Sequence, residues 1–108
     1  MTDKIVVLST CGSAEEAERI ARALVSKRLA ACVNLVPAVR SIYLWKGAVE
    51  DAEETLLVIK SCRALFEDVR AEIEKLHSYE LAEVIAIPIV DGSPAYLEWL
   101  ARELIEKE

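Results

Sequence analysis

Two segments of the chain are alike, and this repetition constrains the fold more than any other feature. Val6 to Cys11 (VVLSTC) resembles Leu57 to Cys62 (LVIKSC), and each is followed by a segment with helical spacing and then by an extended one. Two βαβ units with right-handed crossovers form a four-stranded antiparallel sheet with both main helices on one face. The sequence therefore predicts an α+β fold, a ferredoxin-like split βαβ sandwich, in a single domain over residues 1–108.

A long, kinked hairpin is expected in the middle of the chain. Residues 31–45 and 49–61 are rich in β-branched and aromatic side chains, which favour extended structure. Pro37 interrupts the first of these strands and indicates a bulge or an edge position. Lys46-Gly47 supplies the turn, because glycine readily adopts positive φ. Together with strands at 4–10 and 83–90, the hairpin completes the expected sheet.

The helices are placed by their start signals. Ser13 and Glu16 form a capping box, in which the serine accepts from the N3 amide and the glutamate reaches back to the cap amide. This predicts a helix ending near Arg28. Ser61 is the expected N-cap of a second helix over 62–76, and Ser93-Pro94 opens a third that continues to the end of the chain. The third helix carries an apolar stripe, which covers either its own sheet or a neighbouring subunit.

The charge balance indicates which partners to expect. The formal net charge is −6, from 13 basic and 19 acidic residues, so nucleic acid and anionic membranes are not expected partners, whereas cations are attracted. The apolar stretch after Lys4 is too short for a signal peptide. The three cysteines are odd in number and widely spaced, which favours reduced thiols. We therefore expect the protein in the cytoplasm.

One face of the expected sheet has no cover within the first four strands and two helices. Hydrophobic residues make up 54% of the chain, a large fraction for a domain of 108 residues. An apolar sheet face needs a partner layer. We therefore expect the chain to associate with copies of itself through this face.

Four segments match the CutA divalent-cation tolerance family in spacing and order. They are Leu29–Asn34 (LAACVN), Ser41–Gly47 (SIYLWKG), His77–Glu83 and Tyr96–Leu100 (YLEWL). Each motif is weak alone, but together they span most of the chain. The resemblance implies a ferredoxin-like subunit that forms a homotrimer, similar to the nitrogen-regulatory signal proteins. It also implies a role in tolerance of copper and other divalent cations.

The third segment departs from the family pattern. The family usually has His-Pro-Tyr followed later by Pro-Glu, whereas this chain has His77-Ser78-Tyr79 and no proline before Glu83. Loss of both prolines removes a constraint on the backbone of this loop. Copper-binding members are described with a cysteine at the end of the first strand and a histidine pair opening the loop. The matching positions here are Ser9 and Leu76-His77, so only His77 carries over.

The residues themselves suggest a different metal pair, Cys11 with His77. Thiolate and imidazole suit copper or another soft divalent cation, and the loop after the second helix can approach the end of the first strand. The alternative for His77 is an imidazolium at a helix C-terminus. Cys32 is expected to pack as a small hydrophobe. Cys62 lies where a helix N-terminus could stabilise a thiolate, but a structural role is expected because no His or second Cys is nearby in sequence.

Aromatic and charged residues suggest a cleft between subunits, because rings with one polar atom favour partly wet interfaces. The alternative is simple packing. Such a cleft leads to a second hypothesis for the function, that the protein is a small-molecule sensor or signalling trimer. No catalytic motif is recognisable, so we expect a binding protein, not an enzyme. The cleft residues expected are Tyr43, Trp45, Glu53, Lys60, Tyr79, Glu80, Glu83, Tyr96 and Trp99.

Overall fold

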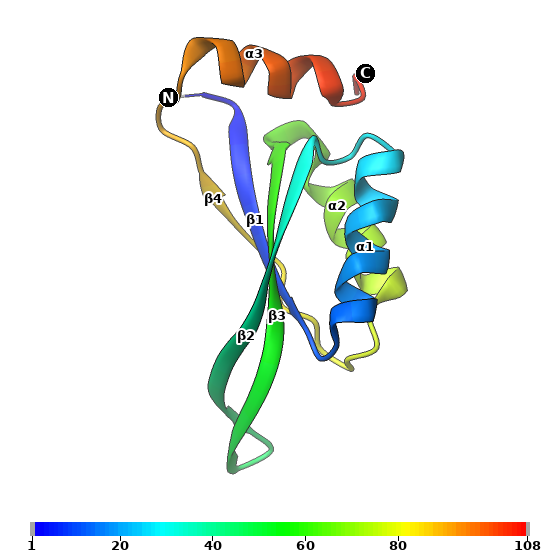
Figure 1. Ribbon diagram of the computed structural model, residues 1–108, viewed down its shortest axis with the longest axis vertical. Coiled ribbons are helices and arrows are strands. Elements are labelled where there is room, and N and C mark those ends of the chain that lie inside the picture. Colours follow the sequence, from blue (N-terminus) through cyan, green and yellow to red (C-terminus); the bar gives the residue numbers. More distant parts are fainter. Residues whose placement is uncertain (1, 108) are drawn as a thin grey trace.

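The computed structural model describes residues 2–107 and has the expected ferredoxin-like α+β topology (Figure 1). All neighbouring strands are antiparallel, in the order β2-β3-β1-β4. The elements in chain order are β1 (Lys4–Cys11), α1 (Ala14–Ser26), β2 (Cys32–Trp45), β3 (Ala48–Cys62), a 3-10 turn (Arg63–Leu65), α2 (Phe66–Leu76), β4 (Ile85–Pro88) and α3 (Pro94–Glu103).

The hydrophobic core lies between the sheet and the pair α1 and α2, which cover the same face (Figure 1). Alternate residues of β1 are buried, as expected for a strand with one face against helices. Val7 and Ile59 face each other across β1 and β3 and are fully buried with Leu24 of α1 and Ile73 of α2. The two helices thus seal one side of the sheet.

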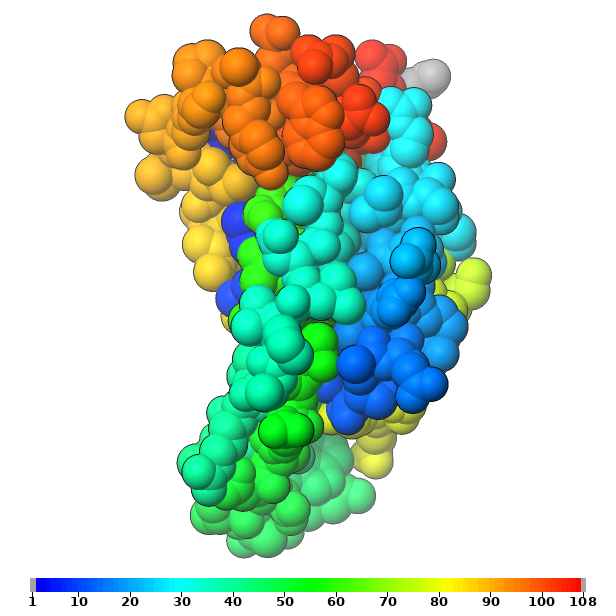
Figure 2. All heavy atoms as spheres, viewed as in Figure 1, coloured from blue at the N-terminus to red at the C-terminus, as the bar shows by residue number. Residues whose placement is uncertain are grey.

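The β2–β3 hairpin extends beyond the helices, and the space-filling view shows it as a narrow projection (Figure 2). Its register shifts between Val36 and Val39, around the Pro37 that indicated a bulge, and Ala38 takes φ 61°. Gly47 closes the tip with φ 84°, as the Lys46-Gly47 pair predicted. The bulge increases local twist and bends the projecting part of the hairpin.

The expected N-cap at Ser61 is wrong. Ser61 lies within β3, fully buried, and its hydroxyl donates to the Leu29 carbonyl at 2.7 Å. The helical segment begins instead with the 3-10 turn at Arg63, for which Cys62 occupies the N-cap position. α2 itself starts at Phe66. The strand continues because Ser61 finds a tertiary partner for its hydroxyl and does not need the helix amide.

Other boundaries also differ from expectation. α1 ends at Ser26 and α3 at Glu103, and β4 covers only residues 85–88. The carbonyls of Arg102 and Glu103 accept hydrogen bonds from the Arg28 guanidinium at 2.7 and 3.0 Å, which satisfies the end of α3.

Half of the predicted capping box is present at the start of α1, since Ser13 Oγ accepts a hydrogen bond from the Glu16 amide at 3.2 Å. The Glu16 carboxylate does not return to the cap.

No element formed by residues 2–107 covers the sheet face away from α1 and α2. α3 crosses one end of the sheet and buries Leu100 and Leu104 there, so it does not cover this face (Figure 1). Ile85 and Ile87 of β4 are 51% and 47% exposed. In the register of the sheet they lie opposite Leu8 and Val6 on the same face. The open face continues across β3 and β2 with Leu56, Val58 and Val36.

Candidate metal cluster and adjoining cleft

Three titratable side chains meet where β1 ends and α1 begins. Cys11 is the last residue of β1, Glu16 lies in the first turn of α1, and His77 follows the last residue of α2. One ligand atom from each, namely the Cys11 sulfur, a Glu16 oxygen and a His77 nitrogen, lies within 4.8 Å of the other two. The short β1–α1 connection and the end of α2 therefore bring together the predicted pair, Cys11 and His77, and add a carboxylate.

His77 is held by two backbone groups. Its Nε2 lies 2.7 Å from the Thr10 carbonyl, which can only accept, so Nε2 donates. Its Nδ1 accepts from the Tyr79 amide at 3.1 Å. The ring is thus the neutral Nε2–H tautomer in this arrangement, and not the imidazolium that its place at a helix end suggested. Its side chain is only 1% exposed.

Glu16 is an unusual buried carboxylate. The residue is 6% exposed, and Oε2 accepts a hydrogen bond from the Ser78 amide at 3.0 Å. Its other oxygen, Oε1, is buried and has no hydrogen-bond partner among the residues from 2 to 107. This oxygen lies 3.8 Å from His77 Nδ1. An unpartnered buried carboxylate oxygen is costly, so it marks a place where a positive group would be favoured.

The thiol of Cys11 is fully buried, and its pKa is raised from 9.0 to about 11. Burial is the largest cause, the negative charges of Glu16 and Glu54 act in the same direction, and Arg19 opposes them. The thiol is therefore protonated at neutral pH. A bound cation would favour the thiolate, so metal binding here is expected to release a proton.

The donor set of this cluster fits a divalent cation. Sulfur, imidazole nitrogen and carboxylate oxygen are the ligands that zinc and copper accept. Cys11 and Glu16 have their donor atoms in place, whereas His77 offers Nδ1 only if the Tyr79 amide turns away. Sequence patterns did not indicate Glu16 as a ligand, because its place three residues after Ser13 indicated a capping role. Its nearness to Cys11 follows only from the tight turn between β1 and α1.

A cleft of about 500 Å³ lies next to this cluster, on the other side of the end of β1. Tyr79 forms the boundary between them, since its amide binds His77 and its hydroxyl donates to Glu54 Oε2 at 2.7 Å. Burial and the Glu54 charge raise the pKa of this phenol. Tyr43 and Trp45 of the hairpin also line the cleft, as does Glu83 from the loop between α2 and β4.

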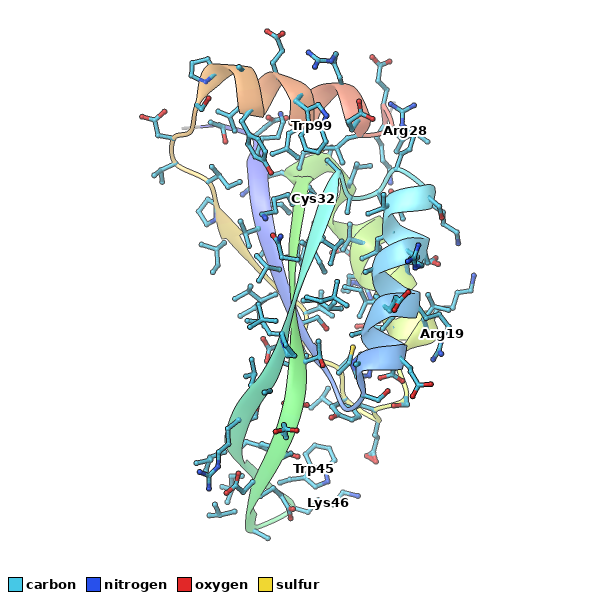
Figure 3. The ribbon with its side chains drawn as sticks, viewed as in Figure 1. Arg19, Arg28, Cys32, Trp45, Lys46 and Trp99 are labelled. Carbon is cyan, nitrogen blue, oxygen red and sulfur yellow. The ribbon has the colours of Figure 1, made fainter. Side chains whose placement is uncertain are left out.

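Part of the predicted cleft set lies elsewhere in the chain. Tyr43, Trp45, Tyr79, Glu80 and Glu83 gather around the hairpin and the adjoining loop. Figure 3 places Trp99 at the opposite end of the molecule from Trp45.

Three further residues of that set also lie outside the cleft. Tyr96 stacks near Trp99, with 5.6 Å between ring centroids. The Lys60 ammonium donates a hydrogen bond to the Asn34 side-chain oxygen on the open sheet face. Glu53 of β3 stands opposite Arg40 of β2 in the sheet register. The two groups do not meet within one chain, so a joint cleft remains a prediction about neighbouring copies.

The other two cysteines lie apart from the cluster. Cys32, Cys62 and Cys11 are all free thiols. Cys32 is half-buried and stands opposite Lys60 in the sheet register, and its role as a small packing residue stays a prediction. Cys62 packs at the edge of the core and occupies the N-cap position of the 3-10 turn, without a side-chain hydrogen bond to it. Among the described residues, no helix has the length and apolar character needed to cross a membrane.

The strand order, the two helices on one face and the long hairpin define a ferredoxin-like α+β domain, and its buried cluster has the donor atoms of a metal site. The chain belongs to the CutA1 divalent ion tolerance protein family, which it matches over residues 5–103. The resemblance found in the four sequence segments is thereby confirmed.

Relatives with known names agree with this assignment. The chain is 46% identical over 95 residues to the divalent-cation tolerance protein CutA of Thermus thermophilus, covering 88% of this chain and 92% of that protein. It is 48% identical over 91 residues to protein CutA of Mus musculus, covering 84% of this chain. The chain spans about half of the mouse protein, 51% of its length.

Solved structures of relatives have the same fold. The structure of the divalent cation tolerance protein CutA1 from Thermus thermophilus superposes with a TM-score of 0.91 at 44% identity, covering 94% of this chain and 98% of that one. CutA1 from Oryza sativa superposes with a TM-score of 0.94 at 40% identity, covering 96% and 95%. The expected family and fold are therefore both established for this chain.

Proposed function

We propose that this protein binds divalent cations, copper among them, at Cys11, Glu16 and His77, and that it contributes to cation tolerance as a homotrimer in the cytoplasm. The observation that carries the proposal is the buried Glu16 Oε1, which has no hydrogen-bond partner among residues 2–107, lies 3.8 Å from His77 Nδ1 and belongs to the cluster with Cys11. A cation would neutralise this carboxylate. The free thiols at Cys11, Cys32 and Cys62 support a reducing compartment.

Cation binding requires two local changes. The Cys11 thiol must lose its proton, which a nearby cation favours. The Tyr79 amide must also release His77 Nδ1. Because Tyr79 opens a loop without the family's usual prolines, the backbone there is free to adjust. The result would be a compact site with sulfur, oxygen and nitrogen donors.

Binding without catalysis is the role that the cluster favours. The Cys11 thiol is buried and protonated at neutral pH, which suppresses its nucleophilicity. His77 has both ring nitrogens engaged by backbone groups, so it is not poised to exchange protons with a substrate. A bound cation would therefore be cargo or a regulatory signal.

The open face of the sheet supports the trimer. Val6, Leu8, Ile85 and Ile87 form a continuous apolar surface there, and α3 covers only one end of the sheet. A face of this kind is favourable when it is buried against another copy. The hairpin and β4 add unpaired strand edges, since β2 and β4 are the outer strands.

Calorimetric titration with Zn²⁺, Cu²⁺ and Cu⁺ tests the cation site. The variants are Cys11→Ala and Glu16→Gln in a background that also carries Cys32→Ser and Cys62→Ser, so that other thiols do not contribute. We expect one saturable site in the background protein, with affinity lowered at least about tenfold by either change, or about 1.4 kcal/mol. Glu98→Gln on the exposed face of α3 is the charge-matched control. Equal affinity in all variants would rule out this site.

A second candidate function is the binding of a small molecule, which the cleft beside Tyr79 favours. Its volume of about 500 Å³ lies in the range of ligand sites, and rings and carboxylates converge on it. Binding here would suit a sensor or signalling trimer. Thermal unfolding across a panel of metabolites tests this function, and a reproducible rise in Tm that is lost on Tyr43→Ala would support it.

A further inference from the structure

The cleft beside Tyr79 carries negative charge and aromatic surface together. Glu54 lies in β3 and is only 6% exposed, and Glu83 lines the same cleft from the loop. The rings of Tyr43, Trp45 and Tyr79 form much of the remaining wall, and none of the described residues that line the cleft is basic. A carboxylate and π faces attract the same kind of group, a cation with some apolar surface.

The surroundings of Glu83 oppose its ionisation. Burial raises the pKa of Glu83, and the negative charge of Glu54 raises it further. Glu54 accepts one hydrogen bond, from the Tyr79 hydroxyl, which is a neutral donor. A positively charged ligand would relieve this repulsion, whereas an anionic ligand would increase it.

The chain already places an ammonium group against Trp45, one of the residues that line this cleft. Lys46 Nζ lies 5.5 Å from the ring centroid of Trp45 and 3.7 Å from a carboxylate oxygen of Glu80. Figure 3 shows Trp45 and Lys46 together at the tip of the hairpin. An indole face and a carboxylate thus hold an amine at the surface, and the lining of the cleft has the same two kinds of group in Tyr43 and Glu54.

We propose that the cleft formed by Tyr43, Trp45, Tyr79, Glu54 and Glu83 binds a small organic cation, with its ammonium group against the carboxylates and its carbon atoms against the rings. This inference rests on the second candidate function, that the cleft receives a small molecule, and adds the class of ligand. The cleft is a separate site from the metal cluster, because Cys11 and Glu16 do not line it.

Three probes of equal length test the proposal: n-butylammonium, n-butanol and butyrate, which differ in charge at one end. The chain has two tryptophans, Trp45 in the cleft and Trp99 at the far end, so the indole N–H signals in an NMR titration report the two places separately. We expect n-butylammonium to shift the Trp45 signal in a saturable way at fixed ionic strength, and to leave Trp99 unchanged. Butanol should shift Trp45 at least about tenfold more weakly, and butyrate should not bind.

Two variants complete the test. Glu54→Gln removes the charge but keeps an acceptor for Tyr79, and we expect it to weaken n-butylammonium binding about tenfold. Glu98→Gln makes the same charge change on α3 and should leave binding unaltered. Tm of each variant verifies that it is folded.

The outcomes separate the two levels of the proposal. If butanol or butyrate binds as well as the amine, or if Glu54→Gln leaves amine binding unchanged, the class of ligand is wrong while the cleft remains a small-molecule site. If none of the probes shifts Trp45, both the ligand class and this binding site are overturned. Titration of the same protein with Zn²⁺ then shows separately whether the cluster of Cys11, Glu16 and His77 binds the cation.

Discussion

At the scale of single residues, a few buried polar groups determine the chemistry of this protein. Cys11, Glu16 and His77 share one small volume, and Tyr79 links it to the cleft through its amide and its hydroxyl. The short β1–α1 connection brings Cys11 and Glu16 together, and His77 joins them from the end of α2. Substitutions at these positions therefore test individual interactions while the sheet remains intact.

The pH dependence of stability should report Cys11. Its pKa is raised from 9.0 to about 11 in the folded chain, so the folded state binds more protons than the unfolded state between these values. The contribution is present below pH 9 and is lost as pH rises to about 11, by up to about 2–3 kcal/mol. Denaturant unfolding across this window should show a smaller loss in Cys11→Ala. An equal loss in both proteins would contradict the raised pKa.

Tyr79→Phe should destabilise the fold by about 1–2 kcal/mol, because the buried Glu54 loses its donor at 2.7 Å. Urea unfolding measures this change. Tyr96→Phe on exposed α3 is the matched control and is expected to alter stability by less than about 0.5 kcal/mol. A neutral result for Tyr79→Phe would mean that water satisfies Glu54 equally well.

At the scale of elements, the hairpin carries a strained bulge. Ala38 adopts φ 61° beside Pro37, in the left-handed region that costs L residues about 1–2 kcal/mol. Ala38→Gly should stabilise the protein by about 0.5–1 kcal/mol in urea unfolding, since glycine removes the strain but loses more entropy on folding. Ala48→Gly, in the regular part of β3, should destabilise it instead. Destabilisation by both changes would show that the bulge is not strained.

The sequence predicted the elements better than their ends. The repeated strand–helix halves and the Lys46-Gly47 turn are local signals, and the structure confirms both. Ser61 was misassigned because its hydroxyl binds Leu29, a partner 32 residues away that no local pattern indicates. Glu16 was overlooked as a ligand for the same reason, since its capping position suggested another role and its neighbour His77 comes from a distant helix.

At the scale of the whole molecule, one sheet face is covered by helices and the other is left apolar. Ile87→Lys places a charge on the open face and should convert a trimer to monomers in sedimentation equilibrium without loss of the fold. Ile105→Lys is a matched control, because Ile105 is also 47% exposed but lies beyond α3. Wild-type protein that sediments as a monomer would contradict the proposed assembly.

X-ray absorption spectroscopy of the zinc-loaded protein tests the central claim most directly, that one thiol, one carboxylate and one imidazole bind a divalent cation together. With Cys32→Ser and Cys62→Ser in place, we expect one sulfur at about 2.3 Å together with nitrogen and oxygen neighbours, and no sulfur after Cys11→Ala. A spectrum with only nitrogen and oxygen neighbours, unchanged by Cys11→Ala, would contradict the proposed site.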